Sequence, residues 1–359
     1  MAALLPQGAR ADTLIDHVNG LGMDAQGQAT RFTGLVIGDD GKIATLLGAY
    51  DIRPRTRFAV DGHGARLLPG RLLDRGQLVR MGLSLLLGGK PLANLPPPRP
   101  EDRDLALATA QKALLAQGIT TVVDMGTTIE DWQALRRAGD AGRLAIRVIC
   151  YAGGIADMAL IGGPGPSPWL YDGRLKLQGV WLDAGGPARA RPNLIQLKNM
   201  MSRAAMDHFQ VAVQVAGPVA GADSAAPELP PAALPAPRAR RLAAPAPPAL
   251  PPLLRADVEK AIADLGETYT GDRRWRIEEA EPVLEPAAEA APPGEEAARA
   301  QAAANAEAAR RAFAESRLGR IATGLYADFI LTGGDGAGAG GWQVWVSGRQ
   351  VYAAERPAA

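Results

Sequence analysis

The stretch that decides the fold is LLPGRLLDRGQLVRMGLS, residues 67–84, which lies where the sequence pattern changes. Before it, short runs with strand composition, such as RFTGLVIG and RFAVD, are separated by turn signals that include Asp39-Asp40-Gly41. After it, helical and strand patterns alternate. The stretch therefore marks the passage from a small antiparallel β unit to a larger unit of another type.

The middle of the chain has the pattern of an α/β domain. DLALATAQKALLAQG, residues 104–118, has apolar residues at helical spacing and ends at Gly118, and it leads into the strand pattern ITTVVDMG. Further strand patterns, RLKLQGVWLD, FQVAVQVA and RRWRIEEAE, alternate with helical segments. Strands that are apolar almost throughout and alternate with helices predict a mainly parallel sheet covered by helices, either a barrel or an open sheet.

Both ends of the chain read as β structure. LYADFILTGG and WQVWVSGRQVY resemble the strands near the start, so residues 1–69 and 318–359 are predicted to form one small β domain. The α/β domain is placed at 70–285, with a Pro/Ala-rich linker at 222–254. Residues 286–317 have high helix propensity but almost no apolar stripe, which predicts an exposed Ala/Glu-rich helix.

Composition excludes several classes of partner. The chain of 359 residues has 39 Lys and Arg against 38 Asp and Glu, so its net charge of +1 predicts no binding to nucleic acid or to an anionic membrane surface. No apolar run reaches the roughly 18 to 20 residues that span a bilayer. The single cysteine, Cys150, lies in an apolar run and is predicted to be a buried thiol. The N-terminus predicts a cytoplasmic protein, with export as the alternative if MAALLPQGARAD is the remnant of a signal peptide.

Several blocks together resemble the amidohydrolase superfamily. They are ADTLIDHVNG, DDGKIATLLG, the LLPG of residues 67–70, GITTVVDMG, MSRAAMDHFQVAVQVAG, ETYTGDRRWRIE, LGRIATGLYADFIL and WVSGRQVY. Their arrangement is most similar to the branch that contains N-substituted formamide deformylases and exoenzyme-regulator-like hydrolases. The resemblance implies a (β/α)8 barrel with a metal site at the carboxyl ends of its strands and a small β domain built from both termini. Two stretches, after Gly89 and between residues 279 and 318, are too short for the strands the family would have, so a truncated or distorted barrel is expected.

The resemblance also locates the family's metal ligands, and this sequence has other residues there. Arg75 and Gln77 stand at the His-x-His pair, Trp181 at the strand lysine, and Gln214 and Glu279 at the two later histidines. Arginine is always protonated and offers no lone pair to a cation, and an indole cannot be carbamylated. The family's catalytic Asp has no counterpart. The resemblance therefore implies no metal, no other cofactor and no catalytic residue, but five polar or aromatic side chains at the former metal positions.

Other candidate metal ligands are weaker. His17, His63 and His208 have no ligand spacing and are predicted to be structural or surface residues. A carboxylate site made from Asp124, Asp183, Glu278 and Glu279 is disfavoured, because neighbouring residues on a strand point to opposite faces. Instead, Arg75 and Glu279 are predicted to form an ion pair where the metal would have been.

Three functional hypotheses follow. The first is an amidohydrolase-like protein that has lost metal-dependent hydrolysis and remains as a pseudoenzyme or scaffold, in which the former metal positions are either filled in or form a residual polar pocket for a small-molecule ligand. The second is a hydrolase of non-peptide carbon-nitrogen bonds that works through a rearranged metal site. The third is a truncated or artificial chain with no selected function, which the Ala/Pro-rich segments would fit.

Overall fold

The protein is described here by a computed structural model. It describes residues 13–24, 26–89, 96–186, 191–216, 251–279, 295–333 and 342–354. The N-terminal segment that bears on export and most of the predicted linker 222–254 lie outside these ranges.

The centre of the molecule is one sheet of six parallel strands in the order β13-β12-β11-β10-β9-β8. The strands are β8 (Arg71–Gly76), β9 (Ile119–Thr127), β10 (Arg147–Ala152), β11 (Leu175–Asp183), β12 (Gln210–Gln214) and β13 (Arg276–Glu278). A closed barrel of this type has eight strands, whereas this sheet ends at β8 and β13. The predicted truncated α/β barrel is therefore confirmed as an open half-barrel.

Helices cover the outer face of the half-barrel. They are α1 (Leu78–Leu86), α2 (Pro100–Leu115), α3 (Ile129–Asp140), α4 (Ile155–Gly162), α5 (Leu194–Met206) and α6 (Arg255–Gly266). Their apolar side chains form one large core with every second residue of the strands, including Val148, Val180 and Val211. The helices α1 and α2 touch so closely that a Cβ on Gly82 would lie 1.9 Å from the carbonyl oxygen of Ala106. Only glycine fits at this crossing.

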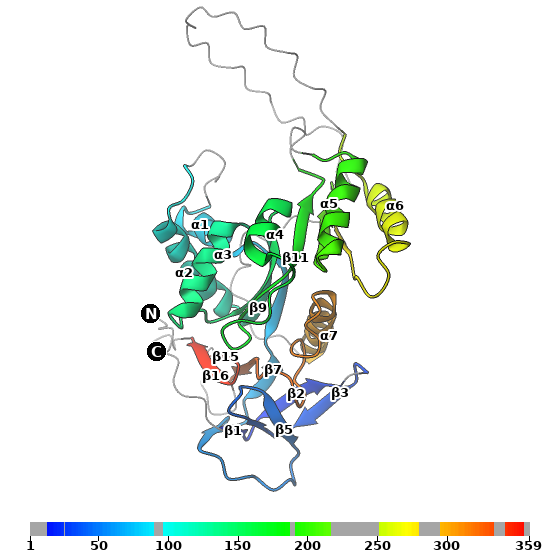
Figure 1. The fold of residues 1–359 in the computed structure, drawn as a ribbon. Coiled ribbons are helices and arrows are strands. Elements are labelled where there is room, and N and C mark those ends of the chain that lie inside the picture. The colour runs from blue at the N-terminus through cyan, green and yellow to red at the C-terminus, as the bar shows by residue number, and fades with distance from the viewer. Residues whose placement is uncertain are drawn as a thin grey trace, which may run out of the picture.

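The inner, concave face of the sheet is covered by a seventh helix, α7 (Glu295–Arg311). Figure 1 shows it on the opposite side of the sheet from α2 and α3. Ala309 and the segment that follows α7 pack against Met125 and Tyr151 of the sheet. The sequence predicted an exposed helix here, and the prediction is wrong for the face of α7 that contacts the sheet. The contact is made by small alanine side chains, which do not register as an apolar stripe but allow the helix to approach closely.

Asn305 of α7 is fully buried and bonds to the backbone at the edge strand β8. Its Oδ1 accepts a hydrogen bond from the backbone N–H of Leu72 at 2.9 Å, and its Nδ2 donates to the carbonyl of Gly70 at 3.0 Å. A neighbouring strand in a closed barrel would make such a pair of backbone bonds. The side chain of Asn305 therefore satisfies part of the open edge that the missing strands leave.

Two small β sheets lie beyond one end of the half-barrel (Figure 1). The first has the order β16-β15-β14-β7-β2-β3 and the second has the order β5-β4-β1-β6. Their strands are β1 (Thr13–Asp16), β2 (Asn19–Met23), β3 (Ala29–Phe32), β4 (Gly34–Ile37), β5 (Ile43–Leu47), β6 (Phe58–Asp61), β7 (Arg66–Pro69), β14 (Phe329–Thr332), β15 (Trp342–Val346) and β16 (Arg349–Ala353). Because β14 pairs with β7, strands from both ends of the chain share one sheet, as predicted.

A buried ion pair joins the half-barrel to the β sheets. Arg147, at the start of β10, is fully buried, and its Nε and Nη2 bind the two carboxylate oxygens of Asp328 at 2.7 and 3.0 Å. Its Nη2 also donates to Oγ of Ser347 at 2.6 Å, and its Nη1 to the carbonyl of Gly173 at 2.5 Å. The guanidinium lies 3.8 Å from the centre of the Tyr326 ring. Every nitrogen of the guanidinium has a partner, as a buried charge requires.

Candidate functional site: an ion-pair network at the strand ends

The carboxyl ends of the strands converge at one edge of the half-barrel. In the sheet register Asp183 lies beside Gln214, and Gln214 lies beside Glu278. Arg75 and Gln77 follow at the end of β8 and the start of α1. In enzymes of this architecture the reacting groups are found at this edge. The predicted site residues are therefore expected at this edge.

A register shift in β8 changes what this strand presents. The pairing of β8 with β9 shifts register twice, between Arg71 and Leu72 and again between Leu73 and Gly76, and at the second shift the intervening residues Asp74 and Arg75 form a bulge. Strict alternation would place these two side chains on opposite faces, but a bulge re-aims one of them. Asp74 and Arg75 thus contact the same cluster of charged groups.

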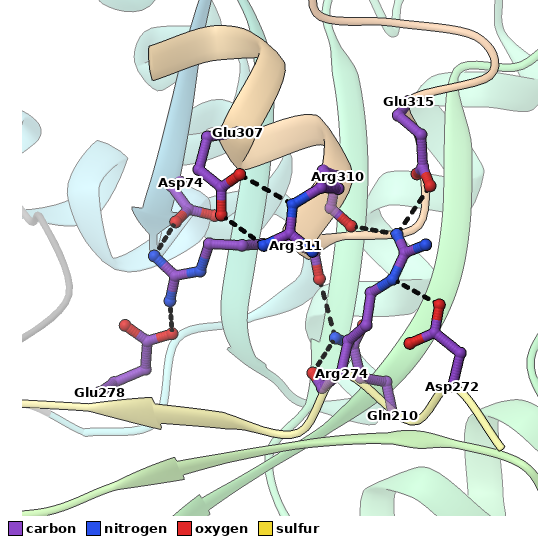
Figure 2. Close-up of polar contacts among 9 residues, drawn as sticks. All are labelled: Asp74, Gln210, Asp272, Arg274, Glu278, Glu307, Arg310, Arg311 and Glu315. Carbon is purple, nitrogen blue, oxygen red and sulfur yellow. Dashed lines mark hydrogen bonds and ion pairs between the residues drawn. The ribbon is translucent and has the colours of Figure 1, made fainter. Parts of the chain in front are cut away.

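Glu278 is the centre of that cluster. The carboxylate, only 2% exposed, receives Nε of Arg276 at 2.7 Å and Nη2 of Arg311 at 2.5 Å on Oε1, while Nη1 of Arg75 lies 3.6 Å from Oε2. The same two arginines also bind Asp74, with Arg276 Nη2 at 3.0 Å from Oδ1 and Arg311 Nη1 at 2.8 Å from Oδ2. Figure 2 shows Arg311 reaching from α7 to Asp74 on one side and Glu278 on the other. We call these five residues the ion-pair network.

Burial and charge act against each other in the network. Burial raises the pKa of Asp74, whereas the guanidiniums of Arg276 and Arg311 act to lower it. Burial acts to lower the pKa of Arg276, but attraction by Tyr151, Asp74 and Glu278 outweighs it and raises the pKa above its usual value. Burial also raises the pKa of Tyr151 to about 12, and its hydroxyl bonds to Oε1 of Gln210 at 2.6 Å. Near neutral pH this phenol is a hydrogen-bond donor and not a base.

The residues of the network do not suit a metal ion. Three guanidiniums face two carboxylates, which leaves a net charge of +1 at the end of the sheet where the resemblance implies a metal ion. Arginine cannot lose its proton to become a ligand, and each carboxylate already binds two or more guanidinium groups. Within the described ranges, no three His, Cys, Asp or Glu side chains are grouped so that they could share a metal ion.

The prediction that Arg75 pairs with Glu279 is wrong, because the carboxylate beside Arg75 is that of the preceding residue, Glu278. Glu279 is exposed, and its Oε1 lies 3.4 Å from Nη1 of Arg255, outside the network. Glu278 stands at the strand end instead, because β13 places Arg276 and Glu278 on the same inward face and turns the next residue outward. The spacing Arg-x-Glu at 276–278 is the signal that could have identified this face. Asp74 and Arg311 gave no such signal, since a bulge and a distant helix bring them in.

The other predicted positions are also at this end of the sheet. Gln77 and Trp181 both lie against Gly126, where a Cβ would be 3.3 Å from Nε2 of Gln77 and 3.2 Å from Cε3 of Trp181. Oε1 of Gln77 accepts from Nη1 of Arg80 at 2.9 Å, and the buried Nε1 of Trp181 has no acceptor among the described residues. Gln214 is 2% exposed, and its Nε2 donates to the carbonyl of Val215 at 3.1 Å.

The alternative carboxylate ligands are already engaged in separate surroundings. Asp124 accepts from the backbone N–H of Leu78 at 2.7 Å and from Oγ1 of Thr127 at 2.6 Å. Burial raises its pKa to about 6, against those two hydrogen bonds. Oδ1 of Asp183 accepts the backbone N–H groups of Gly185 and Gly186 at 3.1 and 2.7 Å. These contacts order the start of α1 and the turn after β11.

The three histidines lie away from this edge, and Cys150 is on the face of the sheet that the outer helices cover. His17 and His63 are exposed beside Asp61 in the small β sheets, and His208 is exposed in the turn before β12. Cys150 is fully buried as predicted, and burial raises the pKa of its thiol well above the usual value. No thiolate nucleophile is available at that position near neutral pH.

Comparison with known structures identifies the architecture. No protein-family model matches the chain. A search of curated proteins finds no match either. Among solved structures, a zinc-bound adenosine deaminase from Xanthomonas campestris aligns with a TM-score of 0.57 at 14% identity, over 94% of this chain and 92% of that one. An uncharacterized metal-dependent hydrolase from Pyrococcus furiosus aligns with a TM-score of 0.55 at 12% identity, over 89% and 98%.

A further uncharacterized metal-dependent hydrolase, from Pyrococcus horikoshii, aligns over 57% of this chain and 65% of its own length, with a TM-score of 0.45 and 16% identity. At identities this low the likeness concerns the fold alone. The chain therefore has a fold similar to that of the adenosine deaminase and the Pyrococcus furiosus hydrolase, reduced to a half-barrel of six strands. None of the helices in the described part of the chain combines the length and apolar character needed to cross a bilayer.

Proposed function

We propose that this chain is a pseudoenzyme that descends from the amidohydrolase superfamily, with the N-substituted formamide deformylase branch as its nearest origin. In this proposal the metal position has been converted into the ion-pair network. The chemistry left at the strand ends is hydrogen bonding and ion pairing among Arg75, Gln77, Trp181, Gln214 and Glu278. The protein then acts as a scaffold that binds partners or small molecules without hydrolysing them.

The observation that carries the proposal is the position of three arginines around Glu278. A hydrolytic metal site needs neutral imidazoles or free carboxylates, and it keeps one coordination position open for water. Here Arg276 and Arg311 bind Oε1 of Glu278 at 2.7 and 2.5 Å, and α7 with Arg311 lies across the concave face. The site is therefore both positively charged and covered by protein.

Metal analysis of the purified protein tests the proposal directly. We expect no stoichiometric zinc, manganese or iron, and no change in the unfolding midpoint with added zinc or with a chelator. An ion present at 100 times its Kd would stabilise the folded protein by about 2.7 kcal/mol. About one bound equivalent, together with a midpoint that falls on chelation, would favour the alternative hydrolase with a rearranged metal site.

Hydrolysis assays on N-formyl amines, cyclic amides and aryl amides provide the second test. We expect no turnover above the uncatalysed rate in the protein as purified or after incubation with zinc. Turnover that is lost in E278Q, while that variant remains folded, would contradict the proposal. E279Q is the matched control, because this neighbouring carboxylate lies outside the network.

A further inference from the structure

Two positively charged side chains lie around one indole at the amino end of β11, on the concave side of the sheet. Lys176 is the second residue of this strand and pairs with Ile149, Trp169 lies in the loop before the strand, and Arg317 follows α7. Nζ of Lys176 is 5.8 Å and the guanidinium carbon of Arg317 is 6.0 Å from the centre of the Trp169 ring. We call Trp169, Lys176 and Arg317 the cationic cluster. It lies at the opposite end of the strands from the ion-pair network.

Neither cation of the cluster has a carboxylate partner in the described part of the chain. The side chain of Lys176 makes no hydrogen bond there, and that of Arg317 makes one, from Nη1 to the hydroxyl of Tyr326 at 3.4 Å. Burial lowers the pKa of the Lys176 ammonium, and the positive charge of Arg317 lowers it further. Two like charges held near each other repel, so binding of an anion between them is favourable.

The charged ends of the cluster are accessible to dissolved molecules. Trp169, Lys176 and Arg317 are each partly exposed. The nitrogens that lack a hydrogen-bond partner are Nζ of Lys176 and Nε and Nη2 of Arg317, and none of them is among the buried unpartnered atoms of the described residues. A ligand can therefore reach both cations and the exposed part of the indole without a change of the fold.

Backbone contacts fix the segments that carry the cluster. In the loop of Trp169, the N–H of Ser167 donates to the carbonyl of Leu177 at 3.1 Å, and its Oγ accepts from the N–H of Leu177 at 2.8 Å. In the segment after α7, the carbonyl of Arg317 accepts from the N–H of Tyr326 at 2.9 Å. The three side chains therefore start from ordered backbone, which reduces the entropy that a ligand must overcome on binding.

We propose that the cationic cluster binds a small molecule that has an oxyanion head group, a phosphate or a carboxylate, on a planar ring. Nε and Nη2 of Arg317 form one edge of the guanidinium, which can donate two parallel hydrogen bonds to either head group. Nζ of Lys176 donates to the same head group, and the ring packs against the indole of Trp169. The inference does not depend on the pseudoenzyme proposal, because it uses the other end of the strands and needs no metal result.

Titration calorimetry with phenyl phosphate and benzoate tests the proposal, with phenol as the neutral control ligand. We expect at least one of the two anions to bind, and phenol to bind at least about tenfold more weakly. K176Q and R317Q each remove a charged donor, so each should weaken anion binding by roughly ten- to a hundredfold. W169L should weaken it by about two- to tenfold. The same variant should leave the affinity for inorganic phosphate or acetate, which have no ring, unchanged.

K198Q is the matched control, because Lys198 of α5 forms an ion pair with Asp264 outside the cluster. It should bind the anion like the unchanged protein. Circular dichroism checks the fold of each variant, and K176Q removes no side-chain hydrogen bond within the described residues. The proposal is overturned if neither anion binds, if phenol binds equally well, or if a folded cluster variant keeps its full affinity for the anion. An equal loss in K198Q would also overturn it, since it would show a general effect of charge.

Discussion

At the scale of single residues, Glu278 and Glu279 are adjacent carboxylates with opposite surroundings. Glu278 is buried among Arg75, Arg276 and Arg311, while Glu279 is 45% exposed beside Arg255. Alternation along β13 explains the difference, because neighbouring side chains on a strand point to opposite faces. A buried charge loses its solvation and depends on its partners, whereas an exposed ion pair contributes little.

We therefore expect E278A to lower the free energy of unfolding by about 3 to 5 kcal/mol, because it leaves buried guanidiniums without their counter-charge. E279A, the control on the same strand, should change it by less than about 0.5 kcal/mol. Urea unfolding followed by circular dichroism measures both. Similar losses in the two variants would show that the network does not stabilise the fold.

The raised pKa of Asp124 leads us to expect that the free energy of unfolding depends on pH. Its pKa of about 6 in the folded protein lies above the ordinary value of 3.8, so the folded state holds this proton more tightly than the unfolded state. Its contribution is fully present below pH 4 and is lost as the pH rises through 6. With 1.36 kcal/mol for each pKa unit, the loss between pH 4 and 7 is about 3 kcal/mol.

D124N should be free of this loss, because an amide stays neutral and can still accept from the N–H of Leu78. The unfolding free energy of D124N minus that of the unchanged protein should rise by about 3 kcal/mol between pH 4 and 7. D39N, a change at an exposed turn, controls for the removal of one negative charge. A difference that does not vary with pH would show that Asp124 titrates normally in the folded protein.

At the scale of secondary-structure elements, α7 takes over part of the role of the missing barrel strands. It covers the concave face with alanines, supplies Arg311 to the ion-pair network and bonds the β8 edge through Asn305. An uncovered sheet edge exposes unpaired N–H and C=O groups that invite association with other chains. The helix therefore protects this edge as well as filling the space inside the half-barrel.

Replacing Asn305 with alanine should leave the N–H of Leu72 and the carbonyl of Gly70 without their partner. At about 1 to 3 kcal/mol for each buried group, we expect N305A to lower the unfolding free energy by roughly 2 to 4 kcal/mol. Amide hydrogen exchange should be faster at Leu72 in particular. A303Q, on the exposed face of the same helix, is the control and should have little effect. Unchanged protection of Leu72 in N305A would rule out this role of the helix.

At the scale of the whole molecule, the half-barrel and the small β sheets are joined by Arg147 and Asp328. The two residues are 181 positions apart in sequence, and the fully buried guanidinium fills a polar junction that also includes Gly173 and Ser347. Removing one partner of a buried ion pair strongly destabilises a protein, because the other charge is left buried without a counter-charge. The relative position of the two parts thus depends on both members of the pair.

R147M and D328N should each lower the unfolding free energy by about 3 to 5 kcal/mol. Because both remove the same interaction, the double variant should lose clearly less than the sum of the single losses. The partly exposed pair of Arg137 and Asp104 provides the control, and R137M should cost less than about 1 kcal/mol. Thermal or urea unfolding measures all four variants. Strictly additive losses would mean that the two residues act independently.

The sequence by itself determined the elements whose signals are local. Apolar periodicity, turn residues and capping positions are read within about ten residues, and they predicted the alternating strands and helices, the β structure at both ends and the buried Cys150. The two stretches that are too short for the strands of the similar family, after Gly89 and between residues 279 and 318, also predicted that the barrel would not close. The residue types at positions 75, 77, 181, 214 and 279 are also the basis for the prediction that the metal ligands implied by the resemblance are replaced.

Only the tertiary structure decided which charged groups meet. The bulge at Asp74 and Arg75 depends on pairing with β9, and the inward position of Glu278 depends on the register with β12. One face of the alanine-rich helix is buried because a concave sheet accepts small side chains, and the sequence of the helix itself does not show this. Ion pairs and close packing are set by contacts between segments far apart in the chain, so a local pattern cannot predict them.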